Sequence, residues 1–229
     1  MSTSIATEAE IPSLSVRRRA ASRELMRVEI LAAAQHIIRT QGLDALSLRA
    51  LAKSLGITAP ALYEYFGNKD AILRAVFVQG AEIMLALMDE TIAESPPGLR
   101  KLLAILDAYR AFARDEPDYF RLLFGTVDPN LDLSDEDYQG MNTIFERFVG
   151  VVADCIEAGE LQPLPLMTVG CALWALTHGA ALLETESFMA RKDVGHDSEA
   201  PQFDAAIQLS LLSFATEKGA TLISSFESQ

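Results

Sequence analysis

The sequence predicts an all-α protein, and three observations lead to this prediction. Half of the 229 residues are hydrophobic, which is enough to build a folded core. Apolar residues recur at helical spacing, and no run alternates convincingly at a period of two. Glycine and proline fall mostly between the apolar stretches, where they end helices. We expect about nine helices, with an N-terminal three-helix helix-turn-helix domain followed by a helical bundle.

The first element expected is a polar arm over residues 1–18, mobile and ending in basic residues. A helix over residues 20–41 follows, because Ile30 and Ile37 belong to an apolar stripe at helical spacing. Gly42 suits the C-terminal end of this helix, because glycine adopts the backbone conformation that stops a helix.

Residues 47–73 then carry the pattern of two short helices that cross at a steep angle. Such a crossing needs a small contact residue, here Ala52, and a turn residue that tolerates a positive φ angle, here Gly56. Ser47 and Thr58 are natural N-caps, because their hydroxyl groups can accept a free backbone N–H. The alternative is an ordinary helical hairpin inside a core.

The second of these helices favours DNA recognition over that alternative. Pro60 fits its first turn, where a missing N–H costs little. Short side chains allow a helix to lie deep in the major groove. The side chains expected to be exposed are those of Thr58, Ala59, Pro60, Ala61, Tyr63 and Glu64.

The run from Gly56 to Phe66, with Asn68-Lys69 and Ile72-Leu73, resembles the N-terminal domain of the TetR family of transcriptional regulators. The resemblance implies that Tyr63 and Lys69 contact phosphates and that residues 58–61 face bases. Tyr65 stands where many members have His, and Pro60 where many have Gly. We assign this domain to residues 19–68. The expected DNA-binding residues are Arg18, Arg19, Ser47, Arg49, Thr58, Ala59, Pro60, Ala61, Tyr63, Tyr65 and Lys69.

The distribution of charge supports a DNA-binding N-terminal end. The whole chain has a net charge of −13, yet residues 1–74 hold ten basic and seven acidic residues, a net charge of +3. The remainder carries −16, so a polyanion is attracted only to the N-terminal end. The triplet Arg17–Arg19 can be a solvated charge run, but beside this domain we expect it to reach phosphates or a minor groove. Arg23 and Arg27 are expected to extend the basic surface.

Residues 69–229 are expected to form a ligand-binding and dimerisation domain. Its first helix, with Asn68 as its cap, continues out of the DNA-binding domain and would link the two rigidly. Ser134 and Asp137 can form a capping box for a later helix. The helices expected cover about residues 69–93, 99–114, a short stretch from 117, a helix to 158, 165–189 and, after a polar loop over 191–201, 202–226.

The segment Trp174–Gly179 resembles the motif of the WHG subgroup of TetR-type C-terminal domains, and Pro117–Phe124 fits the same subgroup. Trp174 and His178 are four residues apart and share one helical face. A buried imidazole needs a hydrogen-bond partner, which can be a protein group or a polar atom of a ligand.

A ligand pocket is expected among methionine and aromatic side chains, because they are bulky and adaptable and suit an apolar organic molecule. No cluster of Lys or Arg falls among them, so a strongly anionic effector is not expected. His178 is expected to orient the ligand, and the alternative is that all ten residues are ordinary core. They are Met84, Met88, Tyr109, Phe112, Phe120, Phe124, Phe145, Phe148, Trp174 and His178.

A homodimer interface is expected on the last two long helices. Ala172, Ala175 and Gly179 form a stripe of small residues that lets a second backbone approach, and residues 205–216 carry no charge. Together with Leu209 and Leu212, they predict a symmetric four-helix contact between two copies.

Other classes of protein receive little support. The three histidines are scattered, and no nucleophile elbow, phosphate-binding loop or metal-spaced cluster is present, so we expect no enzyme, cofactor or metal. Cys155 and Cys171 are expected to be buried free thiols, with a redox sensor as the alternative. Residues 161–183 lack charge over a length that could cross a bilayer, but their Pro, Gly and polar residues favour packing inside protein. No secretory signal is visible, and a cytoplasmic location is expected.

The sequence therefore predicts a ligand-responsive transcriptional regulator, a repressor released from a palindromic operator by a small apolar molecule. The expected partners are double-stranded DNA, the effector and a second copy, without a membrane. The alternatives are an activator of the same fold, a helical binding protein with a vestigial DNA surface, or a DNA-processing enzyme.

Overall fold

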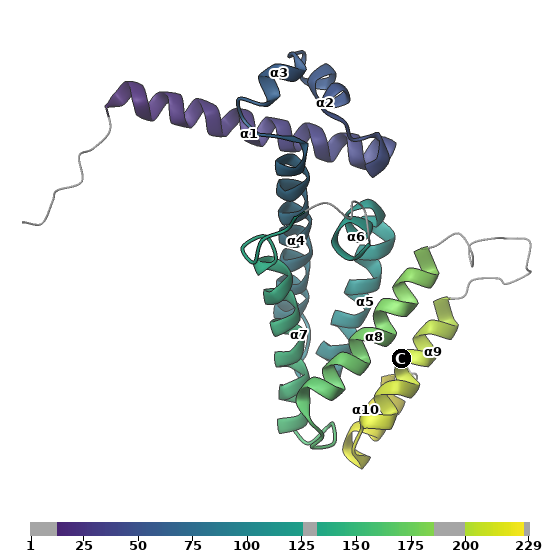
Figure 1. Cartoon of the computed structure of the whole chain (residues 1–229). Helices are drawn as coiled ribbons and strands as arrows, with labels where there is room; N and C mark the ends of the chain where they lie inside the picture. The colour runs from purple at the N-terminus through teal and green to yellow at the C-terminus, as the bar shows by residue number, and fades with distance from the viewer. Residues whose placement is uncertain (1–12, 126–131, 186–199, 227–229) are drawn as a thin grey trace, which may run out of the picture. The chain divides into compact units, whose positions relative to one another are not determined.

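The computed structural model describes residues 13–125, 132–185 and 200–226 (Figure 1). In these ranges the chain forms ten α-helices, one short 3-10 helix and no strand, which confirms the all-α prediction. The helices fall in two compact units, residues 1–76 and 77–229. In the first unit they are α1 Leu14–Gln41, η1 Leu43–Ala45, α2 Leu48–Leu55 and α3 Ala59–Leu62, with the start of α4 Lys69–Glu94. The second unit holds the rest of α4 and α5 Leu99–Asp115, α6 Pro117–Phe124, α7 Gln139–Glu157, α8 Leu166–Thr185, α9 Ala200–Phe214 and α10 Glu217–Phe226.

Helix α1 begins earlier than its apolar stripe predicts. The hydroxyl of Ser13 accepts a hydrogen bond from the backbone N–H of Val16 and caps the helix. Arg17–Arg19 therefore lie in a helix, so the prediction of a mobile arm is wrong for residues 14–18, and residues 1–12 lie outside the described ranges. Gly42 ends α1 with a φ of 85° and donates to the carbonyl of Ile38, as predicted.

Three residues were predicted to cap or turn the chain around α2 and α3, and two of them, Ser47 and Gly56, make the predicted hydrogen bond or turn. Ser47 caps α2 by accepting the backbone N–H of Ala50 at 3.1 Å. Gly56 adopts the left-handed conformation with a φ of 67° and donates to the carbonyls of Ala52 and Lys53. Thr58 is the N-cap residue of α3, as predicted, but the predicted capping hydrogen bond of its hydroxyl is absent.

Helix α4 begins at Lys69, where the side chain of Asn68 accepts the backbone N–H of Ala71 at 2.7 Å, as predicted. The helix runs without interruption to Glu94 and contributes residues to both units, because these divide after Val76. A single continuous helix therefore joins the unit that carries the helix-turn-helix to the unit that follows.

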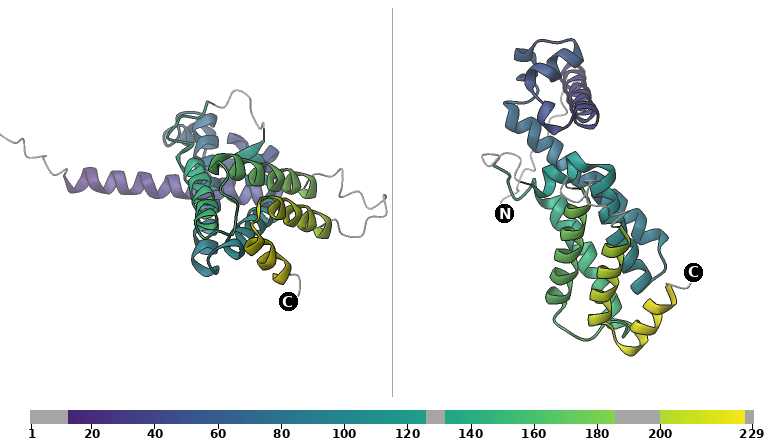
Figure 2. Two further views of the ribbon diagram at one scale, coloured as in Figure 1. Left: turned by 90° about the horizontal axis from the view of Figure 1, so that it is seen from below. Right: turned by 90° about the vertical axis from the view of Figure 1, so that its right-hand side faces the viewer.

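In the second unit, α5 packs against α6, α7 and α8, and α8 packs against α7 and α9. Both views in Figure 2 show α8 and α9 side by side. The predicted capping box before α7 is present, since Ser134 and Asp137 exchange hydrogen bonds between their side chains and backbones. These bonds close a turn, and α7 itself starts at Gln139.

The predicted single helix over residues 202–226 is wrong, because the structure has α9 and α10 with a break at Ala215 and Thr216. Ala215 forms an isolated bridge with Leu161, and the hydroxyl of Thr216 donates to the carbonyl of Gly159 at 2.7 Å. The loop between α7 and α8 thus satisfies the backbone at the break. The predicted loop over 191–201 falls mostly outside the described residues, as does the predicted end of the preceding helix.

Candidate functional site

The exposed side of the short helix α3 forms the candidate recognition surface. Leu62 and Phe66 are buried and fix this segment to the first unit, whereas Thr58, Pro60 and Tyr63 are exposed. Tyr63 has half of its surface in solvent, which is unusual for a large aromatic residue without a partner. Ala59 and Ala61 are half-buried beside them, so the five predicted positions share one segment.

Basic and polar side chains of the same unit surround this segment. Arg49 near the start of α2 and Lys69 at the start of α4 are exposed, as are Arg18 and Arg19 on α1. Ser47 is exposed as well, although its hydroxyl already serves as a cap. A polar surface hollow of about 290 Å³ brings together Arg19, Ser22, Arg23, Glu64 and Tyr65. Tyr65 therefore lies beside Arg19, two of the residues predicted to contact DNA.

Arg23 and Arg27 have a more specific role than the sequence indicated. They donate to the backbone carbonyls of Glu64 and Tyr65, at 2.7 and 2.6 Å. Carbonyls at a helix end lack helical partners, so these two bonds tie α1 to the end of the recognition segment. The guanidinium of Arg27 also lies 4.3 Å from the centre of the Phe66 ring. Their spacing of four along α1 was the signal available in the sequence.

The second unit holds a cavity of about 270 Å³ lined by residues of α4, α5, α6, α7 and α8. Six of the ten predicted pocket residues line it: Met88, Tyr109, Phe124, Phe145, Phe148 and Trp174. The other lining residues are Ile105, Leu106, Met141, Asn142, Ile144 and Thr177. Helix α7 places Met141, Ile144 and Phe148 on one face by its helical period, which is why they converge on the same space.

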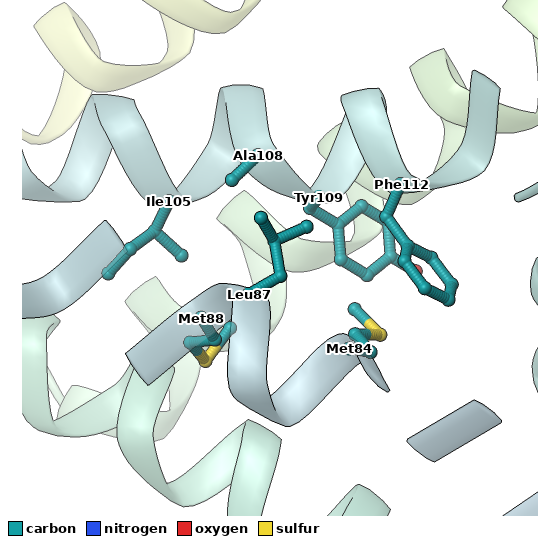
Figure 3. Close-up of a pocket in the computed structure, with 7 residues that line it drawn as sticks. All are labelled: Met84, Leu87, Met88, Ile105, Ala108, Tyr109 and Phe112. Atoms are coloured by element: carbon teal, nitrogen blue, oxygen red, sulfur yellow. The ribbon is translucent and has the colours of Figure 1, made fainter. Parts of the chain in front are cut away.

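Met84 and Phe112 line a separate cavity of only about 10 Å³ between α4 and α5, drawn in Figure 3. Met84, Leu87 and Met88 approach it from α4, while Ile105, Ala108, Tyr109 and Phe112 approach it from α5. This volume is near the minimum for one water molecule. Met84 and Phe112 are thus core residues between two helices, and the prediction that they contact a ligand is not supported.

His178 and Phe120 do not line the larger cavity. Nδ1 of His178 lies 2.7 Å from the hydroxyl of Tyr109, so the imidazole has the protein partner that the sequence left open. Its ring stacks on Trp174 at 5.5 Å between centroids, and the rings of Phe120 and Phe124 also contact it. Burial lowers the pKa of His178, which favours the neutral ring. His178 therefore has a structural partner in Tyr109, and its role in orienting a ligand stays a prediction.

Tyr109 is the centre of this aromatic cluster. Burial raises the pKa of its phenol, and a hydrogen bond from the Trp174 side chain opposes the shift. Its ring also packs edge-on against Phe120 at 5.6 Å. The wall here is a neutral tyrosine whose hydroxyl is hydrogen-bonded to Nδ1 of His178.

A buried ionic network between α5, α8 and α9 was missed in the sequence. The side chain of Arg110 on α5 is 4 % exposed and forms ion pairs with Glu184 on α8, 7 % exposed, and with Asp204 on α9. Burial opposes its charge, but hydrogen bonds to these carboxylates raise the pKa of Arg110. For the acid Asp107, burial raises the pKa, and the positive charge of Arg110 acts in the opposite direction. In the sequence, the only sign of this network was one arginine, Arg110, within the apolar stripe of α5.

Helices α8 and α9 leave apolar side chains uncovered. Ala175 is exposed, Leu209 and Leu212 are 67 % and 37 % exposed, and Ala172 and Gly179 are half-buried. A side chain added at Gly179 would meet nothing within 4 Å. Met167 and Leu183 extend the exposed apolar surface of α8. Monomeric proteins rarely leave such surfaces in water, so the predicted interface residues lie where a partner would be needed.

The two cysteines differ from each other. Cys155 is buried, and burial raises the pKa of its thiol to about 12, which makes it unreactive. Cys171 is exposed on α8, so its predicted burial is wrong. Among the described residues no group of His, Cys, Asp and Glu is arranged to hold a metal ion.

By length and composition alone, α4 and α8 could cross a membrane, and 33 % of the apolar window of α8 is buried inside the structure. Helix α8 packs against α5, α7 and α9, as expected for a helix that lies within a folded protein.

Each of the two structural units matches a known protein family. Residues 30–76 match the family of bacterial regulatory proteins, tetR family, and residues 102–208 match the tetracyclin repressor-like C-terminal domain. The HTH-type transcriptional regulator YobS of Bacillus subtilis is 30 % identical over 168 residues, which cover 72 % of this chain and 82 % of YobS. The HTH-type transcriptional regulator Rv1816 of Mycobacterium tuberculosis is 30 % identical over 63 % of this chain, which spans 61 % of that relative's length.

The fold is also similar to solved structures. A protein with unknown function from Rhodococcus sp. RHA1 superposes with a TM-score of 0.69 at 22 % identity, covering 82 % of this chain and 93 % of that one. A regulator of the TetR/AcrR family from Thermobifida fusca gives 0.61 at 21 % identity, with 81 % and 96 % covered. The relatives are named as regulators and not as enzymes. The chain belongs to the TetR family of DNA-binding transcriptional regulators.

Proposed function

We propose that the protein is a homodimeric repressor that leaves a palindromic operator when a small, largely apolar molecule binds the second unit. The observation that carries this proposal is the continuity of α4. Its first residue, Lys69, is a predicted phosphate contact, and its residue Met88 lines the 270 Å³ cavity. A ligand that shifts α4 at the cavity can therefore change the placement of the recognition surface.

The exposed faces of α8 and α9 support the dimer. Two copies that bury Ala175, Gly179, Leu209 and Leu212 against each other would remove apolar surface from water on both sides. A twofold dimer presents two recognition segments to two half-sites, and a palindrome has the same symmetry. We place this dimer in the cytoplasm, where a regulator meets DNA.

The cavity supports a small effector without charge. Its lining residues include no Lys, Arg, Asp, Glu or His. Because an unpaired charge is costly to bury, this composition disfavours ionic ligands. An activator of the same fold would use the same surfaces, and only the effect on transcription separates the two.

Binding to DNA that flanks the gene, measured at several salt concentrations, tests this proposal. The affinity for one site should fall steeply with salt, because several phosphates are neutralised. Extracts or compound libraries are then screened for loss of the complex. A flat response to salt, or no site bound more tightly than unrelated DNA, would contradict the proposal.

A further inference from the structure

The 270 Å³ cavity has an apolar interior and a polar residue in its wall near the surface. Ile105, Leu106, Met88 and Thr177 are buried, whereas Asn142 and Trp174 are exposed. Asn142 lies in the first turn of α7, and Trp174 lies on α8. The cavity therefore runs from an apolar interior to an opening where an amide and an indole meet solvent.

Four lining residues carry polar side-chain atoms, and the hydroxyl groups of two of them, Thr177 and Tyr109, are already engaged. The hydroxyl of Thr177 donates to the carbonyl of Leu173 at 2.8 Å. The hydroxyl of Tyr109 pairs with Nδ1 of His178 at 2.7 Å. The amide of Asn142 has no hydrogen-bond partner among the residues that the structure describes. This amide is thus the group in this wall that can both donate to a ligand and accept from it, whereas the indole of Trp174 can only donate.

We propose that Asn142 determines the ligand specificity of this cavity, and that the cavity takes a neutral, largely apolar molecule with one carboxamide-like group. The apolar part lies against Ile105, Leu106 and Phe148. The polar group meets the side-chain amide of Asn142, which both donates and accepts and so complements another amide. Only the description of this molecule as the effector rests on the proposed function.

The chemistry of the wall also argues against a carboxylate in place of the amide. The Asn142 side chain can donate to a carboxylate, but none of the described residues that line the cavity is a cation able to balance its charge. The whole chain carries a net charge of −13, which disfavours an anion further. A carboxylate and an amide of equal shape should therefore be distinguished by this site.

The chain offers an internal probe, since Trp174 is its single tryptophan and lines the cavity. Tryptophan fluorescence of the unlabelled protein is titrated with a series of primary amides, from phenylacetamide to phenylhexanamide, and with the matching carboxylates. At least one amide should give a saturable change, and its carboxylate should bind at least about tenfold more weakly.

Variants at position 142 test the residue itself. Asn142→Leu keeps the size of the side chain and should weaken the best amide about five- to tenfold, the effect of one lost hydrogen bond. Asn142→Asp keeps an acceptor, so it should retain part of the amide affinity and weaken the carboxylate further. The matched control is Gln139→Leu, which replaces an exposed amide on the same helix that does not line the cavity. Unfolding curves establish that each variant is folded.

The inference is overturned if no amide in the series changes the fluorescence, if carboxylates bind equally well, or if Asn142→Leu and Gln139→Leu behave alike. Because these titrations contain no DNA, they are independent of the proposed function. Amide binding that depends on Asn142 but leaves a DNA complex intact would support the site and contradict release by this ligand.

Discussion

Arg110 shows how strongly a single side chain can hold helices together. It lies buried between Glu184 and Asp204, which belong to α8 and α9. Arg110→Ala should lower the free energy of unfolding by about 3 kcal/mol, because the buried Glu184 then keeps only the half-exposed Arg114 as a partner. Arg114→Ala is the control, since that side chain is half exposed, and it should cost about 1 kcal/mol or less. Denaturant unfolding measures both, and equal losses would contradict the buried network.

His178 links stability to pH in a defined direction. Burial lowers its pKa below the ordinary value of 6.5, so the unfolded chain binds a proton at higher pH than the folded protein does. The contribution of neutral His178 to the free energy of unfolding is fully present above about pH 6.5. It is lost as the pH falls toward the lowered pKa. His178→Phe should remove this part of the pH dependence, whereas His36→Gln at an exposed site should keep it. Unfolding curves between about pH 7.5 and 5.5 compare them.

The recognition residues should separate into two groups. Tyr63→Ala and Lys69→Ala should weaken binding to all DNA sequences alike, because phosphate contacts carry no sequence information. Substitutions at Thr58 or Ala61 should instead change the preferred bases, each by about 1–3 kcal/mol of discrimination. Competition between the selected operator and its point variants measures both effects. A Tyr63→Ala protein with altered base preference would reverse the assignment.

At the scale of helices, local chemistry decided what the sequence could predict. Gly42, Ser47, Gly56 and Asn68 act on backbone groups within four residues, and all four roles were predictable from pattern alone. The break between α9 and α10 was not, because Leu161 and Gly159 satisfy it from a distant loop. Arg17–Arg19 joined α1 through the cap at Ser13, although no apolar stripe covers them.

In the candidate site, too, local patterns were predictable and contacts between distant segments were not. Met88, Tyr109 and Phe148 were predictable as cavity walls because bulky residues on facing helices converge. His178 was not, since its partner Tyr109 lies on another helix. Asn142 was missed because a single polar residue at the start of an amphipathic helix resembles an ordinary solvated position.

Two glycines give a paired test of how α10 is held. A side chain at Gly219 would collide with the backbone carbonyl of Glu160, so α10 can approach the turn after α7 only with glycine there. Gly219→Ala should cost about 1–3 kcal/mol of stability. Gly150→Ala meets no atom within 4 Å and lies inside α7, so it should be neutral or stabilise by up to about 1 kcal/mol. Similar losses at both positions would contradict the described contact.

For the whole molecule, assembly and DNA binding should depend on each other. Ala175→Glu places a charge in the proposed interface and should dissociate the dimer, because an unpaired charge is costly to bury. Ala86→Glu, the same change at an exposed position of α4, should leave the dimer intact. Sedimentation reads the assembly, and operator affinity should fall only for Ala175→Glu. A folded and dimeric Ala175→Glu protein would place the interface elsewhere.

The division of charge along the chain also favours DNA binding at the N-terminal unit alone. Residues 1–74 carry +3 and the remainder −16, so the second unit repels DNA and restricts contact to the recognition surface. In the proposed dimer, specificity would then depend on two recognition segments that read one site together.

Selection of bound sequences from a random DNA pool tests this central claim most directly. The wild-type protein should enrich an inverted repeat whose half-site centres lie about 34–36 Å apart or modestly more. Ala175→Glu, as a monomer, should enrich at most a single half-site. If wild type enriches no inverted repeat, or if both proteins enrich the same one, the protein does not read DNA as a symmetric dimer.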